Sequence, residues 1–359
     1  MNRTWLAAAF LSIRFMAFAQ IEATDSLASD TIIATTVDTI SARAQEMYNE
    51  GVALYEQGKY GEAVLMFNQS IELNPDFDKA YVNRGATKVT MGEIPAAMAD
   101  FKRALAVNPA ADMAYYHMGR IRHEQNDLEG AHSDYSNAIS ANPGNAQASY
   151  YRACIYFAKE DYFKALKDFN STINADANHA YAYNDRGSTY RMLGDVKAAA
   201  KDYAKAIELD PRLFVAYGNL GSIKKKQGDL EGAVLEYSLA IKMNPSYVQA
   251  YNNRGTVYFE LGKYDEALKD FNKALELNPS YAFALNGRAA VKYKQKDYAG
   301  AEADCTEALK YKSDYGYAFM NRGIAREMLR KPDKACADWK KAKALGVNSA
   351  GAYLTDCHE

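Results

Sequence analysis

The sequence predicts an all-α protein built from antiparallel helical hairpins that stack into one array. Three observations lead to this fold class. Prolines recur at intervals of 34 residues or twice 34. An alanine occupies the same place in every 34-residue unit, and an aromatic residue follows four places later in eight of the nine. A fixed period of this length is the signature of a helical repeat array, because chance does not keep register over most of a chain.

The first 19 residues are predicted to be a secretory signal peptide. Arg3 precedes a mostly apolar stretch, and Ala17-Phe18-Ala19 before Gln20 fits a small-x-small cleavage site. The alternative is an uncleaved anchor, but the apolar stretch is shorter than the roughly 20 residues that span a bilayer and contains Arg14. We expect an exported protein, periplasmic or secreted, without direct membrane insertion once the segment is removed. Whether cleavage occurs stays open.

A polar N-terminal linker, rich in Thr, Ser and Asp, is predicted for residues 20–43. Nine units then follow when each proline is set at position 32. They are 44–77, 78–111, 112–145, 146–179, 180–213, 214–247, 248–281, 282–315 and 316–349. Small residues at positions 8 and 20 let the two helices of a unit approach closely, and the ring at position 24 fills the space beside them. Residues 350–359 are predicted to be a C-terminal capping stub of a tenth first helix.

Turn residues separate the two helices of each unit. Glycine at position 15 is expected to be the left-handed residue that closes the first helix. Aspartate at position 16 is expected to cap the second helix, and proline at position 32 to end it. The glycines are Gly58, Gly92, Gly194, Gly228 and Gly262, and the aspartates are Asp127, Asp161, Asp195, Asp229 and Asp297.

Arginine at position 7 and aspartate at position 23 occur in the same six units. We predict that each pair forms an ion pair between the two helices of its unit, with bidentate geometry. The predicted pairs are Arg84–Asp100, Arg152–Asp168, Arg186–Asp202, Arg254–Asp270, Arg288–Asp304 and Arg322–Asp338.

These positional residues resemble the tetratricopeptide repeat (TPR) family over residues 44–349. The sequence departs from the family where Tyr81 and its equivalents replace Trp at position 4, and where Lys88, Arg122 and their equivalents replace Tyr at position 11. The resemblance implies a right-handed α-α superhelix, a solenoid whose first helices line a concave groove. It also implies a non-catalytic scaffold for protein–protein interaction.

The expected groove carries asparagine at position 6 and tyrosine at positions 2 and 5. The candidate peptide-binding residues are Asn49, Asn83, Asn219, Asn253, Asn321, Tyr116, Tyr150 and Tyr181. Their amides can hydrogen-bond an extended peptide, and their rings can anchor apolar side chains. A polar lining without a dedicated ligand is an equal alternative, and a glycan or small ligand is the second candidate. No position 5 is Lys and no position 9 is Asn, so a clamp for chaperone tails is not expected.

Groove charges are mixed in sign and are most simply a solvated face. The basic residues are Arg120, Lys225, Lys226 and Lys294, and the acidic residues are Glu56, Glu124, Glu260 and Glu327. The formal net charge of −2 argues against nucleic acid as a partner. The partner's identity, the pathway and the oligomeric state stay open.

No catalytic, cofactor or metal site is expected. The sequence has no phosphate-cradling glycine loop and no nucleophile motif. The histidines are expected at the surface, and His117 and His123 lie about 240° apart around one helix. Polar residues recur at fixed repeat positions, which is typical of an architectural role.

A disulfide between Cys336 and Cys357 is predicted to hold the capping stub. Cys336 lies at position 21 of the last unit and Cys357 at position 8 of the stub, and antiparallel packing would bring these positions side by side. Such a crosslink is worth roughly 3 kcal/mol on the chain-entropy estimate. Two buried thiols are an alternative of nearly equal weight.

Overall fold

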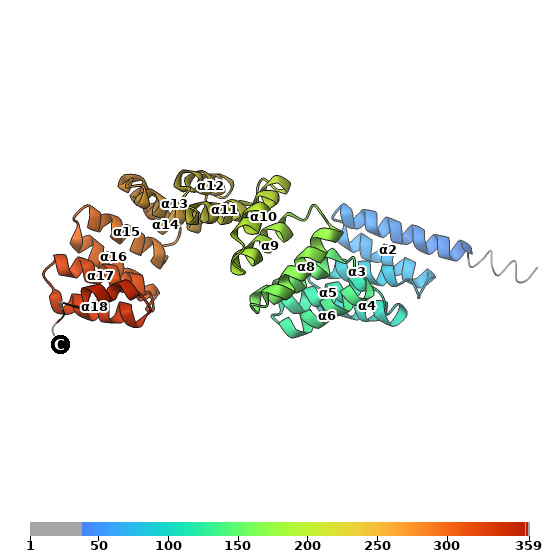
Figure 1. The fold of residues 1–359 in the computed structure, drawn as a ribbon. Helices are drawn as coiled ribbons and strands as arrows, with labels where there is room; N and C mark the ends of the chain where they lie inside the picture. The colour runs from blue at the N-terminus through green and yellow to red at the C-terminus, as the bar shows by residue number, and fades with distance from the viewer. Residues whose placement is uncertain (1–37, 356, 358–359) are drawn as a thin grey trace, which may run out of the picture. The chain divides into compact units, whose positions relative to one another are not determined.

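The structure, a computed structural model, describes residues 38–355 and 357, and every regular element in that part of the chain is a helix (Figure 1). The predicted all-α fold is confirmed. The first helix covers residues 38–56. The elements after it are α2 (Tyr60–Leu73), α3 (Asp78–Thr90), α4 (Ile94–Val107), α5 (Asp112–Glu124), α6 (Leu128–Ala141), α7 (Ala146–Ala158), α8 (Tyr162–Ala175), α9 (Ala180–Met192), α10 (Val196–Leu209), α11 (Phe214–Lys226), α12 (Leu230–Met243), α13 (Val248–Glu260), α14 (Tyr264–Leu277), α15 (Ala282–Lys294), α16 (Tyr298–Tyr311), α17 (Gly316–Met328), α18 (Pro332–Ala344) and the 3₁₀ helix η1 (Asn348–Tyr353).

The helices keep the 34-residue register. In every unit from 78–111 onward the first helix covers positions 1–13, and the second begins at position 17. The described residues form two compact units that divide between residues 155 and 156, inside α7. Residues 38–43 are already helical, so the linker predicted for 20–43 is too long at its C-terminal end. The rest of that linker and the predicted signal peptide fall outside the described residues.

Close helix packing explains the small residues at position 8. A Cβ atom added to Gly85 would lie 2.7 Å from Cε1 of Phe101, and one added to Gly119 would lie 2.6 Å from Cε1 of Tyr135. Both rings are fully buried. Ala289 occupies position 8 in the unit where the smaller Cys305 takes the aromatic position, and the two are buried in one cluster.

The turn at position 15 adopts a left-handed conformation in every unit. The predicted glycines have φ between 73° and 86°. The other four units place Asn126, Glu160, Lys296 and Arg330 there with φ of 62°, 60°, 67° and 56°. The aspartates at position 16 accept a backbone hydrogen bond from the third residue that follows, as predicted for helix caps. The repeat geometry therefore imposes this turn on residues that disfavour it.

The C-terminal cap covers the last hairpin. Val347 and Ala350 are buried against Met320 and Trp339. The cap is a 3₁₀ helix rather than the expected α-helical stub, and it begins inside the last predicted unit, after Gly346 ends α18 with φ of 88°.

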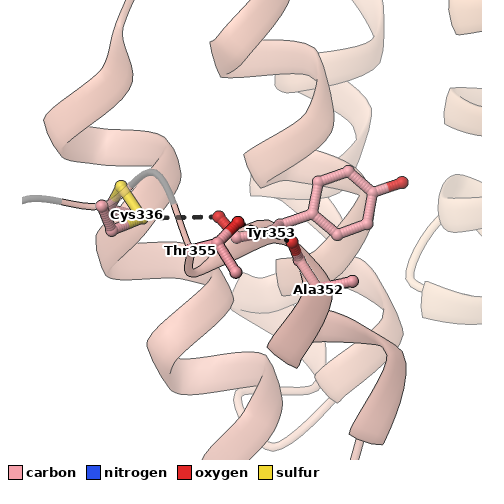
Figure 2. Close-up of a disulfide and its surroundings, with 5 residues drawn as sticks. Cys336, Ala352, Tyr353 and Thr355 are labelled. Carbon is pink, nitrogen blue, oxygen red and sulfur yellow. Dashed lines mark hydrogen bonds between the residues drawn. A yellow bond between two sulfur atoms is a disulfide. The ribbon is translucent and has the colours of Figure 1, made fainter.

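A disulfide joins the cap to α18. It links Cys336 to Cys357, whose Cα atoms lie 5.7 Å apart. Figure 2 shows it beside Tyr353, whose ring centroid lies 5.0 Å from that of Trp339. The crosslink therefore holds in place the segment that shields Trp339 from water.

Candidate peptide-binding groove

Bidentate ion pairs join the two helices of several hairpins. Arg84 donates from Nε to Asp100 at 2.9 Å, and Arg254 donates from Nε and Nη2 to Asp270 at 2.8 and 2.7 Å. The same geometry occurs at Arg186–Asp202, Arg288–Asp304 and Arg322–Asp338. The predicted Arg–Asp pairing is confirmed in these five units. Each carboxylate is buried, so the arginine is its necessary counter-charge.

Position 11 supplies a further cation that sequence analysis noted but did not assign. Lys88, Lys292 and Arg326 each contact an aspartate that already binds the arginine at position 7. Where position 7 is apolar, the position-11 residue forms the ion pair with the acid at position 23. Nη1 of Arg122 lies 2.5 Å from Oδ2 of Asp134, and Nζ of Lys224 lies 2.6 Å from Oε1 of Glu236. Comparing positions 7, 11 and 23 across the units of this one chain would have revealed that position 11 supplies a cation to the acid at position 23.

The same arginines also tie neighbouring hairpins together. The third donor, Nη1, reaches a side-chain oxygen at position 25 of the preceding unit. Examples are Arg84 to Asn68 at 2.7 Å, Arg186 to Asn170 at 2.8 Å and Arg254 to Ser238 at 2.9 Å. Each arginine thus ties its own first helix to the second helix of the preceding unit.

The asparagines at position 6 bond across adjacent units. Nδ2 of Asn83 donates to the Tyr48 hydroxyl at 2.8 Å. In the second compact unit, Nδ2 of Asn219 donates to Asn184 at 3.0 Å, and Nδ2 of Asn321 donates to Asn286 at 2.9 Å.

Each of these three asparagines keeps hydrogen-bonding capacity. Within the described residues, Oδ1 of Asn83, Asn219 and Asn321 accepts no hydrogen bond. The oxygens are available to a ligand while the amides are held in place.

The remaining candidate asparagines accept local bonds instead. Oδ1 of Asn49 accepts from Gln45 at 2.8 Å, and Oδ1 of Asn253 accepts from its neighbour Asn252 at 3.1 Å. Their acceptor oxygens are therefore engaged within their own helices.

The candidate tyrosines differ in what they present to a ligand. Tyr181 is 53% exposed, whereas Tyr116 is only 8% exposed. Tyr116 packs against Tyr135 and Tyr151, and its hydroxyl accepts from Arg120 at 3.2 Å, so its ring is not an anchor for a ligand. Tyr150 is half-buried with its edge against Tyr151.

Two groove cavities lie at the expected positions. One, of about 320 Å³, is lined by Tyr55, Glu56, Asn83 and His117, among others, and we call it the Glu56 pocket. The other, of about 300 Å³, is lined by Tyr293, Lys294, Asn321 and Ile324, among others, and we call it the Lys294 pocket. Both are lined by an asparagine at position 6, one of the positions expected in the groove, together with residues at positions 9, 12 and 13.

The histidines of α5 are half-buried against neighbouring rings, whereas surface positions were expected. His117 stacks on Phe101 with ring centroids 5.3 Å apart, and His123 packs edge-on against Tyr135. Burial, reinforced by the nearby Arg120 charge, lowers the pKa of His117 to about 4. His117 is therefore neutral at pH 7 and adds no positive charge to the Glu56 pocket.

Metal ligands, free thiols and membrane-spanning helices can each be checked in the described residues. No group of three or more His, Cys, Asp or Glu side chains among them is placed to hold a metal ion. Burial raises the pKa of Cys305 to about 12, so this thiol stays protonated and unreactive. No helix in this part of the chain combines the length and hydrophobicity needed to cross a bilayer.

Several solved structures have a similar fold. A chain of the APC/C hetero-tetramer Cut9–Hcn1 is similar over 78% of this chain and 55% of its own, with a TM-score of 0.57 and 16% identity. PilF of Pseudomonas aeruginosa matches with a TM-score of 0.53 and 19% identity, covering 59% of this chain and 97% of its own. A tetratricopeptide repeat protein from Parabacteroides merdae matches with a TM-score of 0.50 and 22% identity, covering 71% of this chain and 98% of its own.

Family sequence models match most of the repeat array. Those described as tetratricopeptide repeat match residues 180–213, 248–281, 82–145 and 118–177, and one described as TPR repeat matches 51–92 and 221–262. No curated protein matches the sequence. The matched ranges cover more than half of the chain, which therefore belongs to the tetratricopeptide repeat family.

Proposed function

We propose that this chain is an exported, non-catalytic scaffold that binds an extended segment of a partner protein in its groove. The family fold supports a role in protein–protein interaction. The observation that carries the proposal is the set of braced asparagines at position 6, whose Oδ1 atoms accept no bond within the described residues at Asn83, Asn219 and Asn321.

This arrangement suits an extended backbone. A peptide in β conformation presents N–H groups that need acceptors, and each of these amide oxygens can accept from one with little sequence preference. The Glu56 and Lys294 pockets add space for side chains beside Asn83 and Asn321. Because the amides are already held by neighbouring units, binding costs little side-chain entropy.

Export is supported by the N-terminal sequence pattern and by the Cys336–Cys357 disulfide, which persists in an oxidising compartment. Fractionation of the native cell with mass spectrometry of the intact protein tests it. The expected result is a protein outside the cytoplasm that begins at Gln20. A cytoplasmic protein that retains Met1 would overturn export and leave the scaffold proposal standing.

Affinity capture tests the scaffold. Residues 20–359 serve as bait on a cell-envelope extract, beside a variant with Asn83→Ala, Asn219→Ala and Asn321→Ala. A partner recovered by the first bait and lost from the second supports groove binding. A matched control carries Glu62→Ala, Lys197→Ala and Lys269→Ala, which are exposed on second helices, and should retain the partner. Equal recovery by all three baits would move the contact out of the groove.

Glycan binding is the second candidate, favoured by exposed rings at position 2. Tyr181 and Tyr317 are 53% and 62% exposed. Binding to a polysaccharide panel that is lost on Tyr181→Ala and Tyr317→Ala, without any protein partner, would favour it over the peptide scaffold.

A further inference from the structure

The Glu56 pocket and the Lys294 pocket are built from the same repeat positions. Each uses positions 9, 12 and 13 of one unit and positions 6 and 9 of the next. Tyrosine occupies position 12 in both, as Tyr55 and Tyr293. Asparagine occupies position 6 in both, as Asn83 and Asn321. An apolar residue stands at each position 9. The two pockets therefore share apolar residues at position 9, a tyrosine ring at position 12 and an asparagine amide at position 6.

The charge at position 13 distinguishes the pockets. It is Glu56 in the first and Lys294 in the second. Both side chains are exposed at the pocket wall, so each presents its charge to whatever enters. Among the five repeat positions that the two pockets share, position 13 is the one that carries a charge, so it sets which sign of charge each pocket attracts.

Neither charge is neutralised within the described residues. Glu56 and Lys294 make no ion pair there, whereas other groove acids are paired, Glu124 with Arg120 at 3.1 Å and Glu260 with Lys225 at 2.9 Å. The one histidine on the wall of the Glu56 pocket, His117, is neutral at pH 7. Each pocket thus keeps one net charge available for a ligand.

The cavity sizes suit a long side chain. Volumes of about 320 and 300 Å³ correspond to roughly ten water molecules each. An apolar floor accommodates the methylene stem of such a side chain while its charged end stays near the pocket mouth.

We propose that the Glu56 pocket selects a lysine or arginine side chain of the bound segment and that the Lys294 pocket selects an aspartate or glutamate side chain. This inference rests on the proposed function, because it assigns two side-chain subsites within a peptide-binding groove. A partly exposed ion pair contributes about 0.2–1 kcal/mol, and charge reversal adds a repulsion of similar size. Reversing either charge should therefore weaken a matched peptide about 10-fold.

Peptide selection tests the assignment. A phage-displayed library of random dodecapeptides is selected on residues 20–359, on Glu56→Lys and on Lys294→Glu. The unaltered protein should enrich two groups of peptides, one carrying a basic residue for the Glu56 pocket and one carrying an acidic residue for the Lys294 pocket. Glu56→Lys should lose the basic preference, and Lys294→Glu should lose the acidic one. Glu62→Lys and Lys269→Glu make the same charge changes on exposed second-helix positions and should leave the selection unchanged.

Affinities of the selected peptides supply the second measurement. Replacing a selected lysine by norleucine keeps the stem and removes the charge, so it should weaken binding to the unaltered protein and strengthen binding to Glu56→Lys, where it removes a like-charge repulsion. Peptides that bind all variants equally would overturn the charge assignment while leaving groove binding intact. Failure of the unaltered protein to select any peptide would overturn both.

Discussion

Arg254 and Asp270 form a two-point contact between α13 and α14, with Nε and Nη2 donating to the two carboxylate oxygens at 2.8 and 2.7 Å. Asp270 is 5% exposed. Position 11 of this unit is Tyr258, whose ring lies under the guanidinium, so Arg254 is the one cation within ion-pair distance among the described residues. Asp304, in the next unit, has two such cations, Arg288 and Lys292.

Arg254→Met should therefore be more costly than Arg288→Met. The first leaves a buried carboxylate without a cation and should lower the free energy of unfolding by about 3–5 kcal/mol. The second leaves Lys292 in place and should cost about 1–2 kcal/mol. Urea unfolding followed by circular dichroism measures both. Equal losses would show that the position-11 lysine does not compensate.

Glycine substitutions at position 15 should stabilise the array where the native residue is strained. Lys296 has φ of 67° without the tolerance of Asn or Gly for this region. Lys296→Gly should raise the free energy of unfolding by about 0.5–1 kcal/mol, as the relief of strain exceeds the added chain entropy. Gly262→Ala should lower it by about 1 kcal/mol, and Asn126→Gly should change it little. Thermal unfolding checks all three, and a Lys296→Gly variant that melts lower would contradict the strain argument.

Reduction of the Cys336–Cys357 disulfide should loosen the C-terminal cap. Trp339 is 3% exposed beneath Tyr353, and the other tryptophan, Trp5, lies in the predicted signal peptide. In a chain of residues 20–359, dithiothreitol should shift tryptophan fluorescence to the red and lower stability by about 3 kcal/mol. Cys336→Ser should reproduce both effects without reductant. Cys305→Ala keeps the disulfide and should retain the reductant response; fluorescence insensitive to reductant would show that the cap holds without its crosslink.

Acidification should destabilise the array through His117. The folded-state pKa is about 4 and the ordinary value is 6.5, so between these values the unfolded chain binds more protons than the folded one. The free energy of unfolding therefore falls as pH drops through this window, by about 2 kcal/mol between pH 7 and 5 from this group. His117→Asn introduces the commonest residue at position 6. It should remove the part of the stability loss between pH 7 and 5 that comes from His117. An unchanged pH profile in the variant would contradict the assignment.

The sequence by itself determined the features that recur in every unit. A 34-residue period with small residues at positions 8 and 20 leaves few ways to pack a hairpin, so the helices, the caps and pairs such as Arg186–Asp202 followed from position alone. Each depends on a contact within one unit, or with its immediate neighbour, that repeats along the chain.

Only the tertiary structure decided what depends on local surroundings. Tyr116 and His117 occupy groove positions, yet three neighbouring rings bury the first and Phe101 stacks on the second. Glu160 and Arg330 carry no sign of a left-handed turn, but the fixed geometry between helices requires one. The sequence left open whether Cys336 and Cys357 form a disulfide or remain two free thiols. Their disulfide required the cap to fold back on α18. The physical reason is the same in each case. The repeat period determines which positions face each other, whereas side-chain size, neighbouring charge and the path of the chain determine the burial, conformation and bonding of the residues at those positions.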